Sequence, residues 1–338
     1  MVCSVKALEK ARLFKGFAYS ERCMSFQSIK RIEKAQTYLD IAIRKALKSK
    51  SSSHQRLDLK KAKQLNMQII GVINDVLSSK LDEIVKDFPA LDNFTEFYAE
   101  LLKVTLDRDE LKKSLGSVNW AKKKINELAR EHKSKSGVAA SFERLDKTRS
   151  AFIGRISSVM KQIDKYLIIL ENARFVMADY PVIKPDLFTV CIVGFPNVGK
   201  TTLLSKLTVS KPDIQAYAFT TKQLNLGYAE MHSQKVQFID TPGTLARPDK
   251  MNNIEKQAYL AIKYCADLII YIFDLTEPYP LEDQKKLLEL MKQFRKPIIV
   301  YLSKTDLLEQ DAIKIFLEGQ DAITIIDELK REITKRIE

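Results

Sequence analysis

Residues 190–202 read VCIVGFPNVGKTT, and this stretch decides the fold of the second half of the chain. An apolar run from Leu187 to Val193 breaks into a loop bounded by two glycines, and a helical pattern follows. The loop fits the pattern G-x-x-x-x-G-K-[ST], whose backbone N–H groups surround a diphosphate at the start of a helix. We expect nucleotide phosphates to contact Gly194, Phe195, Pro196, Asn197, Val198, Gly199, Lys200, Thr201 and Thr202.

Two side chains of this phosphate loop carry predicted chemistry. Lys200 would supply a fixed cation for the β- and γ-phosphates, and the Thr201 hydroxyl would ligate Mg²⁺. The alternative is an ordinary strand–turn–helix that happens to contain two glycines. The strand before the loop and the helix after it favour the phosphate loop.

The chain beyond residue 187 alternates between strand and helix patterns. Apolar strands are expected at 187–193, 236–240, 267–274 and 297–302, with a more polar strand near 223–230. Helices are expected between them, near 200–207, 254–265, 281–294 and 321–337. Such alternation is typical of an α/β fold, here a P-loop domain with a mostly parallel, doubly wound sheet. A ligand of this fold sits at the carboxyl ends of the strands.

Three further motifs fall at or between those strand ends. Asp240 opens the sequence DTPG after an apolar strand, where its carboxylate can hold Mg²⁺ and the N–H of Gly243 can contact a γ-phosphate. Between the phosphate loop and that strand lies YAFTT at 217–221, in which Thr221, preferred over Thr220, can ligate Mg²⁺ while a γ-phosphate is present.

The third motif, SKTD at 303–306, predicts which base the bound nucleotide carries. A carboxylate at Asp306 can accept hydrogen bonds from the N1–H and N2 amino groups of guanine, a pattern that adenine lacks. The stem of Lys304 can lie on the plane of the base. The expected ligands are therefore GTP and GDP with Mg²⁺.

The first half of the chain has few helix breakers, and helical periodicity dominates it. Helices are expected near 25–49, 57–86 and 91–115, with a shorter one following Gly116 and Ser117. The final helix carries a heptad stripe typical of bundle packing: Phe152, Ile156, Val159, Ile163, Tyr166, Leu170, Ala173 and Met177. Pro181 marks the predicted boundary between an all-α bundle at 1–180 and the P-loop domain at 181–338.

The net charge of +13 lies wholly in the first half. Residues 1–180 hold 35 Lys and Arg against 22 Asp and Glu, whereas residues 181–338 hold 21 of each. Basic runs lie at 44–63 around a serine-rich turn, at 122–135 beside Trp120, and at 12–22 among aromatic residues. We expect this module to bind structured RNA through its phosphates. The alternative is a set of solvated, lysine-rich helix faces.

Cysteine spacing and hydropathy exclude several classes of protein. The four cysteines form no C-x-x-C pair and no disulfide framework or zinc site is expected. No run reaches the ~18 apolar residues that a membrane span requires. A reducing compartment, the cytoplasm, is the expected location, with no membrane partner.

The motifs together resemble a known family. The sequences GFPNVGKT at 194–201, AYAFTT at 216–221 and DTPG at 240–243 are similar to those of Obg-like GTPases. The longer stretches DTPGTLARP at 240–248 and NIEKQA at 253–258 resemble the nucleolar GTP-binding (NOG) branch in its short, archaeal form. The resemblance implies a monomeric GTPase that assists assembly of large ribosomal subunits. It implies contact of the helical domain with large-subunit rRNA on pre-ribosomal particles, in the nucleolus where the cell has one.

This chain departs from the family pattern at two places. The base motif normally begins with Asn, and here Ser303 would brace its loop less well, so nucleotide affinity would be modest. The expected Ser-Ala of the last guanine loop is absent, and residues 315–319 (IFLEG) occupy that region.

The resemblance also bears on catalysis, for which we expect Lys200, Thr221, Gly243 and Asn197 to matter. Thr244 stands where Ras-type enzymes have a water-orienting glutamine, so intrinsic hydrolysis should be slow, near the ~10⁻⁴ per second of unassisted Ras. In related GTPases an Asn at the position of Asn197 helps to hold K⁺ against the phosphates. An Asn that only forms hydrogen bonds within the loop is the equal alternative.

Two other functions remain open on the sequence. One is a GTP-binding rRNA scaffold with negligible turnover. The other is a protein-targeting GTPase of the signal-recognition type, which the absence of a DTAGR motif and the length of the helical half disfavour. An ATPase is disfavoured by Asp306.

Overall fold

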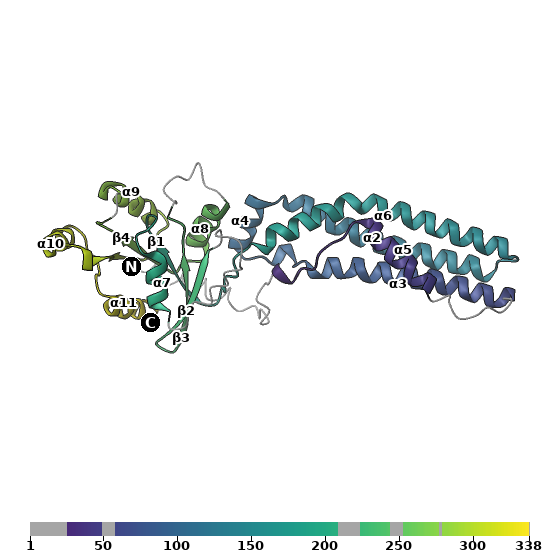
Figure 1. Ribbon diagram of the computed structural model, residues 1–338, viewed down its shortest axis with the longest axis horizontal. Helices are drawn as coiled ribbons and strands as arrows, with labels where there is room; N and C mark the ends of the chain where they lie inside the picture. Colours follow the sequence, from purple (N-terminus) through teal and green to yellow (C-terminus); the bar gives the residue numbers. More distant parts are fainter. Residues whose placement is uncertain (1–25, 49–57, 209–223, 244–252, 277–278, 338) are drawn as a thin grey trace, which may run out of the picture.

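The computed structural model describes residues 26–48, 58–208, 224–243, 253–276 and 279–337. It is elongated, with a helical bundle that extends away from one side of an α/β domain (Figure 1). Both predicted architectures are confirmed: helices come first, and a mostly parallel sheet follows.

The bundle consists of four long helices that run alternately out from the sheet and back. They are α2 (Ala35–Lys48), α3 (Leu59–Asp87), α5 (Arg108–Gly137) and α6 (Phe142–Ala178). Short segments η2 (Phe26–Ser28), η3 (Leu91–Asn93) and α4 (Glu96–Thr105) lie at the end nearest the sheet. The heptad stripe of α6 faces the core: seven of its predicted positions are buried, and Tyr166 is half-buried.

Two predicted helix boundaries in the bundle were wrong. The first long helix begins at Ala35 rather than near residue 25, because carboxylates of α6 take the preceding backbone donors: the N–H of Ile32 donates to Glu171 (2.9 Å) and that of Ala35 to Asp164 (2.8 Å). The chain also breaks before Arg108 instead of at residues 116–117, which lie within α5. Asp107 caps α5 by accepting from the N–H groups of Asp109 and Glu110.

The α/β domain is built on one five-stranded sheet in the order β2-β3-β1-β4-β5. Its strands are β1 (Phe188–Val193), β2 (Asn225–Met231), β3 (Gln234–Asp240), β4 (Leu268–Phe273) and β5 (Ile298–Leu302). Only β2 is antiparallel to its neighbour, and the central strands β1 and β4 are almost fully buried. The sheet is therefore covered on both faces, as a doubly wound fold requires.

Helices and one isolated bridge complete the domain. They are α7 (Lys200–Leu207), α8 (Asn253–Tyr264), α9 (Leu281–Lys292), η5 (Thr305–Leu307), α10 (Gln310–Gly319) and α11 (Ile326–Ile337). Ile323 pairs in parallel with Tyr301 of β5 and extends the sheet by one residue. Residues 315–319 thus belong to a helix, and the sheet edge that would carry a last guanine loop lies after Ile323, which corrects our placement of that region.

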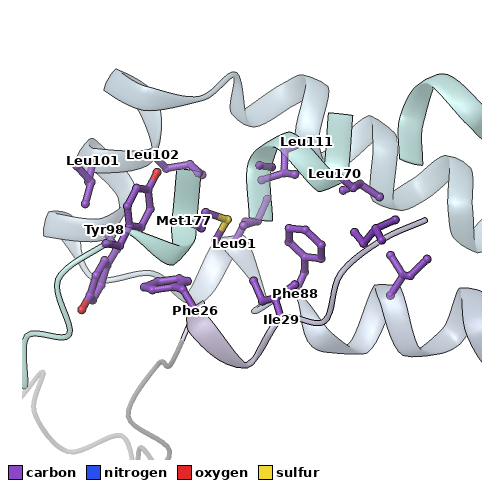
Figure 2. Close-up of a cluster of buried hydrophobic side chains, with 14 of the residues drawn as sticks. Phe26, Ile29, Phe88, Leu91, Tyr98, Leu101, Leu102, Leu111, Leu170 and Met177 are labelled. Carbon is purple, nitrogen blue, oxygen red and sulfur yellow. The ribbon is translucent and has the colours of Figure 1, made fainter. Parts of the chain in front are cut away.

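The two halves are joined by a packed linker between α6 and β1. The hydroxyl of Tyr98 in α4 donates to the carbonyl of Pro181 (2.8 Å) and accepts from the N–H of Ile183 (3.0 Å). Phe26 packs edge-on against Tyr98 and Tyr180, with ring centroids 5.2 and 5.3 Å away. Figure 2 shows Phe26 and Tyr98 in this cluster. The linker is therefore held to the bundle by both hydrogen bonds and rings.

A second connection runs through α4 itself, which packs directly against α8 of the α/β domain. One hydrophobic cluster includes Leu101 of α4 and Ala258 and Ala261 of α8, and it continues into both halves. Because α8 follows the DTPG segment closely in sequence, the bundle touches the element next to the predicted γ-phosphate contact.

Candidate nucleotide site

The predicted site lies at the carboxyl ends of β1, β3 and β5, where parallel strands of a doubly wound sheet present their loops at one edge. The register places Ile192 of β1 beside Asp240 of β3. The phosphate loop, the DTPG segment and the SKTD loop therefore start from the same edge. Residues far apart in sequence come together because strand order, not chain order, sets their neighbours.

The phosphate loop has the tight geometry that its glycines allow. A Cβ on Gly194 would lie 2.8 Å from the carbonyl oxygen of Ile272 in β4, so only glycine fits there. Gly199 has φ +92°, a left-handed conformation, and directly precedes α7. The loop thus ends on a helix N-terminus, the position where backbone N–H groups and the helix dipole favour an anion.

Lys200 is buried beneath this loop. Its Nζ donates to the carbonyl of Phe195 at 2.6 Å, which holds the side chain across the loop. Burial lowers the pKa of Lys200 to about 8, and the negative charge of Asp240 opposes that shift only partly. A phosphate placed against the ammonium group would supply the missing negative charge.

The residues predicted to hold Mg²⁺ include one direct pair. The Thr201 hydroxyl donates to Oδ2 of Asp240 at 2.6 Å, and the amide of Asn225 in β2 donates to the same oxygen at 3.1 Å. Oδ1 of Asp240 is buried and has no hydrogen-bond partner among the described residues. An orphaned carboxylate oxygen beside a threonine hydroxyl fits a hard cation that takes oxygen ligands. Thr221, the third predicted ligand, lies outside the described residues.

The DTPG segment closes against the phosphate loop. Thr241 fixes its start, because its N–H and hydroxyl both bond to the carbonyl of Ile192, at 3.2 and 2.8 Å. Gly243 lies so close that a Cβ there would sit 2.2 Å from the backbone nitrogen of Pro196. The predicted γ-phosphate contact is therefore adjacent to the loop that binds the other phosphates. Thr244 lies outside the described residues.

The predicted base loop is braced from two sides. The Ser303 hydroxyl lies within hydrogen-bond distance of the carbonyl of Val198 in the phosphate loop (2.8 Å) and that of Phe273 in β4 (3.0 Å). A single hydroxyl hydrogen can satisfy only one of them at a time, so reduced nucleotide affinity stays a prediction. Asp306 lies in η5 with an exposed side chain, open to a ligand.

Sequence reasoning missed two residues of this site. Asp274 follows β4 with its side chain fully buried, and its Oδ2 pairs with Nζ of Lys304 at 2.6 Å. Its other oxygen accepts from the N–H and hydroxyl of Thr276, at 2.8 and 2.7 Å. Asp274 thereby fixes the lysine expected to lie on the base. A carboxylate at the end of an apolar strand was the available signal, the same signal that identified Asp240. The second missed residue is Asn225, which nothing in the local sequence marks.

Asn197 is an exposed residue of the phosphate loop with φ 62°. Asn tolerates this left-handed conformation better than most residues, which gives it a local structural reason to stand there. Its expected role in holding K⁺ stays a prediction.

The basic runs of the bundle separate into two kinds of surface. Around the serine-rich turn, four exposed side chains form no ion pair with any described residue, and we call them the distal basic surface: Arg44, Lys45, Lys60 and Lys61. In the second run, by contrast, Lys122, Lys124 and Lys135 pair with acidic side chains of the bundle at 2.6–3.0 Å. Lys50, Arg56 and the whole run at 12–22 lie outside the described residues.

None of the helices within the described ranges is long and apolar enough to cross a bilayer.

Comparison with known proteins matches both halves of the chain. Residues 26–184 match the family model described as NOG1 N-terminal helical domain, and residues 189–304 match that of a 50S ribosome-binding GTPase. An uncharacterised protein of Methanocaldococcus jannaschii is 37% identical over 76% of this chain and 73% of its own length.

Named relatives are longer than this chain. Nucleolar GTP-binding protein 1 of Drosophila melanogaster is 32% identical over 84% of this chain, and the match spans 44% of that protein. The Arabidopsis thaliana protein of the same name is 30% identical over 92% of this chain and 46% of its own length. The chain therefore spans less than half of these two relatives.

The solved structures that match the chain align over a smaller part of it. Aquifex aeolicus Era bound to GDP·AlF₄⁻ is 28% identical over 44% of this chain and 56% of its own, with a TM-score of 0.35. The FeoB G-domain from Methanococcus jannaschii is 24% identical over 44% of this chain and 97% of its own, with a TM-score of 0.34. The sequence matches, which cover both halves, are the ones that define the relationship: the chain belongs to the nucleolar GTP-binding branch of the Obg-like GTPases.

Proposed function

We propose that this protein binds GTP with Mg²⁺ and hydrolyses it to GDP, as a conformational switch during assembly of the large ribosomal subunit. The site would occupy a P-loop domain at 181–338, and an RNA-binding domain would occupy 1–180. One observation carries the nucleotide chemistry: the Thr201 hydroxyl and the buried, half-satisfied carboxylate of Asp240 lie together next to Lys200. The family membership of the chain supports the same reaction class.

Each residue of the site has a proposed task. Lys200 positions and neutralises the β- and γ-phosphates, while the backbone N–H groups of residues 194–199 surround them. Thr201, Asp240 and Thr221 hold Mg²⁺, which when bound would neutralise charge that develops on the phosphate oxygens. Gly243 contacts the γ-phosphate through its N–H. Asp306 selects guanine, and Lys304, fixed by Asp274, supports the base.

Hydrolysis proceeds by in-line attack of water on the γ-phosphate. Thr244 offers no side-chain amide to orient that water, so unassisted turnover should be slow. Asn197 would help to hold K⁺ against the phosphates, in place of the charge that an arginine finger gives other GTPases. Equal hydrolysis rates in K⁺ and Na⁺ buffers would exclude this contribution.

The contact between α4 and α8 supplies the proposed route from nucleotide to bundle. A switch requires an element that both sites bias. Here α8 follows the DTPG segment, and its buried face belongs to the same hydrophobic cluster as Leu101 of α4. Hydrogen exchange of α4 should therefore differ between the GDP-bound and GTP-analogue-bound protein.

The proposed partner is large-subunit rRNA within pre-ribosomal particles, bound by the helical half of a monomer in the cytoplasm or nucleolus. Its support is the excess of basic residues in 1–180 and the unpaired cations of the distal basic surface. Lys and Arg that neutralise phosphates make binding salt-dependent. Two relatives are named nucleolar proteins, in keeping with this partner.

Turnover and crosslinking test this proposal together. The full-length protein should release phosphate from GTP slowly alone and faster with large-subunit particles, and it should crosslink to their rRNA. Lys200→Ala should abolish turnover, whereas Lys206→Ala, an exposed lysine of the same helix, should not.

Three outcomes would redirect the assignment. Particle binding without turnover under any condition would leave a GTP-binding scaffold. Recovery of signal-recognition RNA or translocation components instead of large-subunit rRNA would favour a protein-targeting GTPase. Displacement of GTP by equimolar ATP would contradict the role of Asp306.

A further inference from the structure

The outer face of α5 and α6 carries a groove that the nucleotide site does not use. It is an open cavity of about 490 Å³ between these two helices. Its lining comes from one continuous helical stretch of each helix: Lys113, Gly116, Ser117 and Trp120 of α5, and Gln162, Ile163, Lys165 and Tyr166 of α6. Ile163 and Tyr166 also belong to the heptad stripe of α6, so the groove lies along the edge of that stripe, where the buried core meets the surface.

Two aromatic rings form the apolar part of this groove. Trp120 is 45% exposed, although a tryptophan on a bundle helix gains most from burial. Tyr166 is the one position of the α6 stripe that is only half-buried. Gly116 leaves open space beside them, because a Cβ there would meet nothing within 4 Å. The groove therefore presents ring faces and room for a planar group.

The charged part of the groove is uniformly positive. Lys113 and Lys165 line it, and neither forms an ion pair with any described residue. Nζ of Lys165 instead lies 4.9 Å from the ring centroid of Tyr166. On the same helix as Lys113, Lys112 and Lys124 do have carboxylate partners, Asp92 and Glu127, at 2.6 and 3.0 Å. Unneutralised lysines beside exposed rings fit a ligand that is both anionic and aromatic.

We propose that this groove binds an unpaired nucleotide of an RNA partner. The base would stack on Trp120 or Tyr166, its phosphates would contact Lys113 and Lys165, and the Gln162 amide would face the base edge. Base stacking on aromatic side chains tolerates any sequence, and it requires a base outside a duplex. An acidic peptide would satisfy the lysines but would leave the rings without a planar partner. The inference rests on the proposed RNA-binding function, which it makes more specific: the bundle reads single-stranded features as well as backbone.

Trp120 is the only tryptophan of the chain, so its fluorescence reports on this groove directly. The experiment uses the full-length protein with two probes: a blunt RNA duplex, and the same duplex with a short single-stranded adenosine overhang. Anisotropy of the labelled RNA measures binding, and tryptophan fluorescence measures stacking. We expect the overhang to quench Trp120 and the blunt duplex to leave it unchanged.

Repeating the titration with substituted proteins identifies which side chains bind the overhang. Trp120→Ala should weaken binding of the overhang RNA by about 5- to 150-fold, the range that corresponds to loss of one stacked base, without changing affinity for the blunt duplex. Trp120→Phe keeps a ring and should lose less. Phe175→Ala removes another exposed ring of α6, 68% accessible, and should change neither affinity. Lys113→Ala and Lys165→Ala should each reduce the salt dependence of overhang binding by about 0.7 in log–log slope.

The possible failures are distinguishable. If the blunt duplex binds but the overhang adds neither affinity nor quenching, the groove proposal falls and the RNA-binding function stands. If neither RNA binds, both the groove proposal and the proposed RNA-binding function are contradicted. If polyglutamate quenches Trp120 and displaces the overhang RNA, the groove is a site for an acidic protein segment instead.

Discussion

The two halves of this molecule use charged residues in opposite ways. In the α/β domain, three charged side chains near the strand ends are buried and bonded: Lys200 to the Phe195 carbonyl, Asp240 to Thr201, and Asp274 to Lys304. In the bundle, the cations of the distal basic surface are exposed and have no carboxylate partner among the described residues. A site whose geometry is fixed by the fold can perform chemistry on one small ligand. A surface of exposed, solvated cations can instead bind the many phosphates of a large polyanion.

The helix α4 packs against both halves, so a substitution in α4 is the strongest test of whether the two halves are energetically separate. Leu101 is fully buried in the cluster that spans α4 and α8, and Figure 2 shows it among the buried side chains of the bundle. Leu101→Ala should lower the free energy of unfolding by about 2–5 kcal/mol, through lost burial and the cavity that remains. Fluorescence of Trp120 reports unfolding of the bundle, and release of a bound fluorescent guanine nucleotide reports unfolding of the sheet.

Both transitions should shift to lower urea concentration if α4 is shared. Val104→Ala, on the same helix but 43% exposed, provides the matched control and should shift neither. A shift confined to the Trp120 signal would show that the halves are energetically separate and that no switch passes through α4.

The next largest effect concerns ligand choice in the α/β half. Asp306→Asn replaces two charged hydrogen bonds to guanine by a side chain that can donate as well as accept. GTP affinity should fall by about 1.5–3 kcal/mol, or roughly 10- to 150-fold. A base with a carbonyl at position 2, such as xanthine, should gain, because the new amide can donate to it. Competition titrations of GTP against XTP measure both changes. An unchanged preference for GTP would remove Asp306 from the site.

The buried lysine predicts a pH dependence that an exposed cation would not show. In the free protein the pKa of Lys200 is lowered to about 8, and bound phosphates must raise it. Below pH 8 the lysine is charged in both states, so affinity is constant. As the pH rises above 8, the free protein loses the proton that the complex retains. GTP affinity should then fall, by up to about tenfold per pH unit.

Calorimetric titration on both sides of pH 8 measures this fall and the accompanying proton uptake. Lys200→Arg stays charged across the range, so any remaining pH dependence in that variant belongs to the nucleotide itself. An identical profile in both proteins would mean that Lys200 is not the titrating group.

The same contrast explains what the sequence could and could not predict. Phosphate-loop residues and Asp240 follow from fixed spacing after apolar strands, because the fold allows few other positions for those loops. Asn225 escaped notice because its role depends on strand order, which places β2 beside β3. Asp274 carried the same local signal as Asp240, but its partner Lys304 becomes a neighbour only because β4 pairs with β5. In the bundle, the helix break before Arg108 depended on the capping carboxylate of Asp107, a weaker local signal than Gly116. Which lysines of the second basic run are neutralised depended on neighbouring helices, as with Lys122 and Asp82.

The smallest expected effect tests whether the unpaired cations of the bundle bind phosphate at all. Lys60 is exposed and unpaired within the described residues, whereas Lys124 is partly exposed and paired with Glu127 at 3.0 Å. If each bound phosphate displaces a counterion, Lys60→Ala should reduce the log–log salt slope for a blunt RNA duplex by about 0.9 and weaken binding about fivefold at physiological salt. Lys124→Ala should change the slope less, because its charge is already compensated within the bundle. Equal slopes for both variants and the parent would mean that the distal basic surface is a solvated helix face, and the RNA contact would then have to lie elsewhere on the first half of the chain.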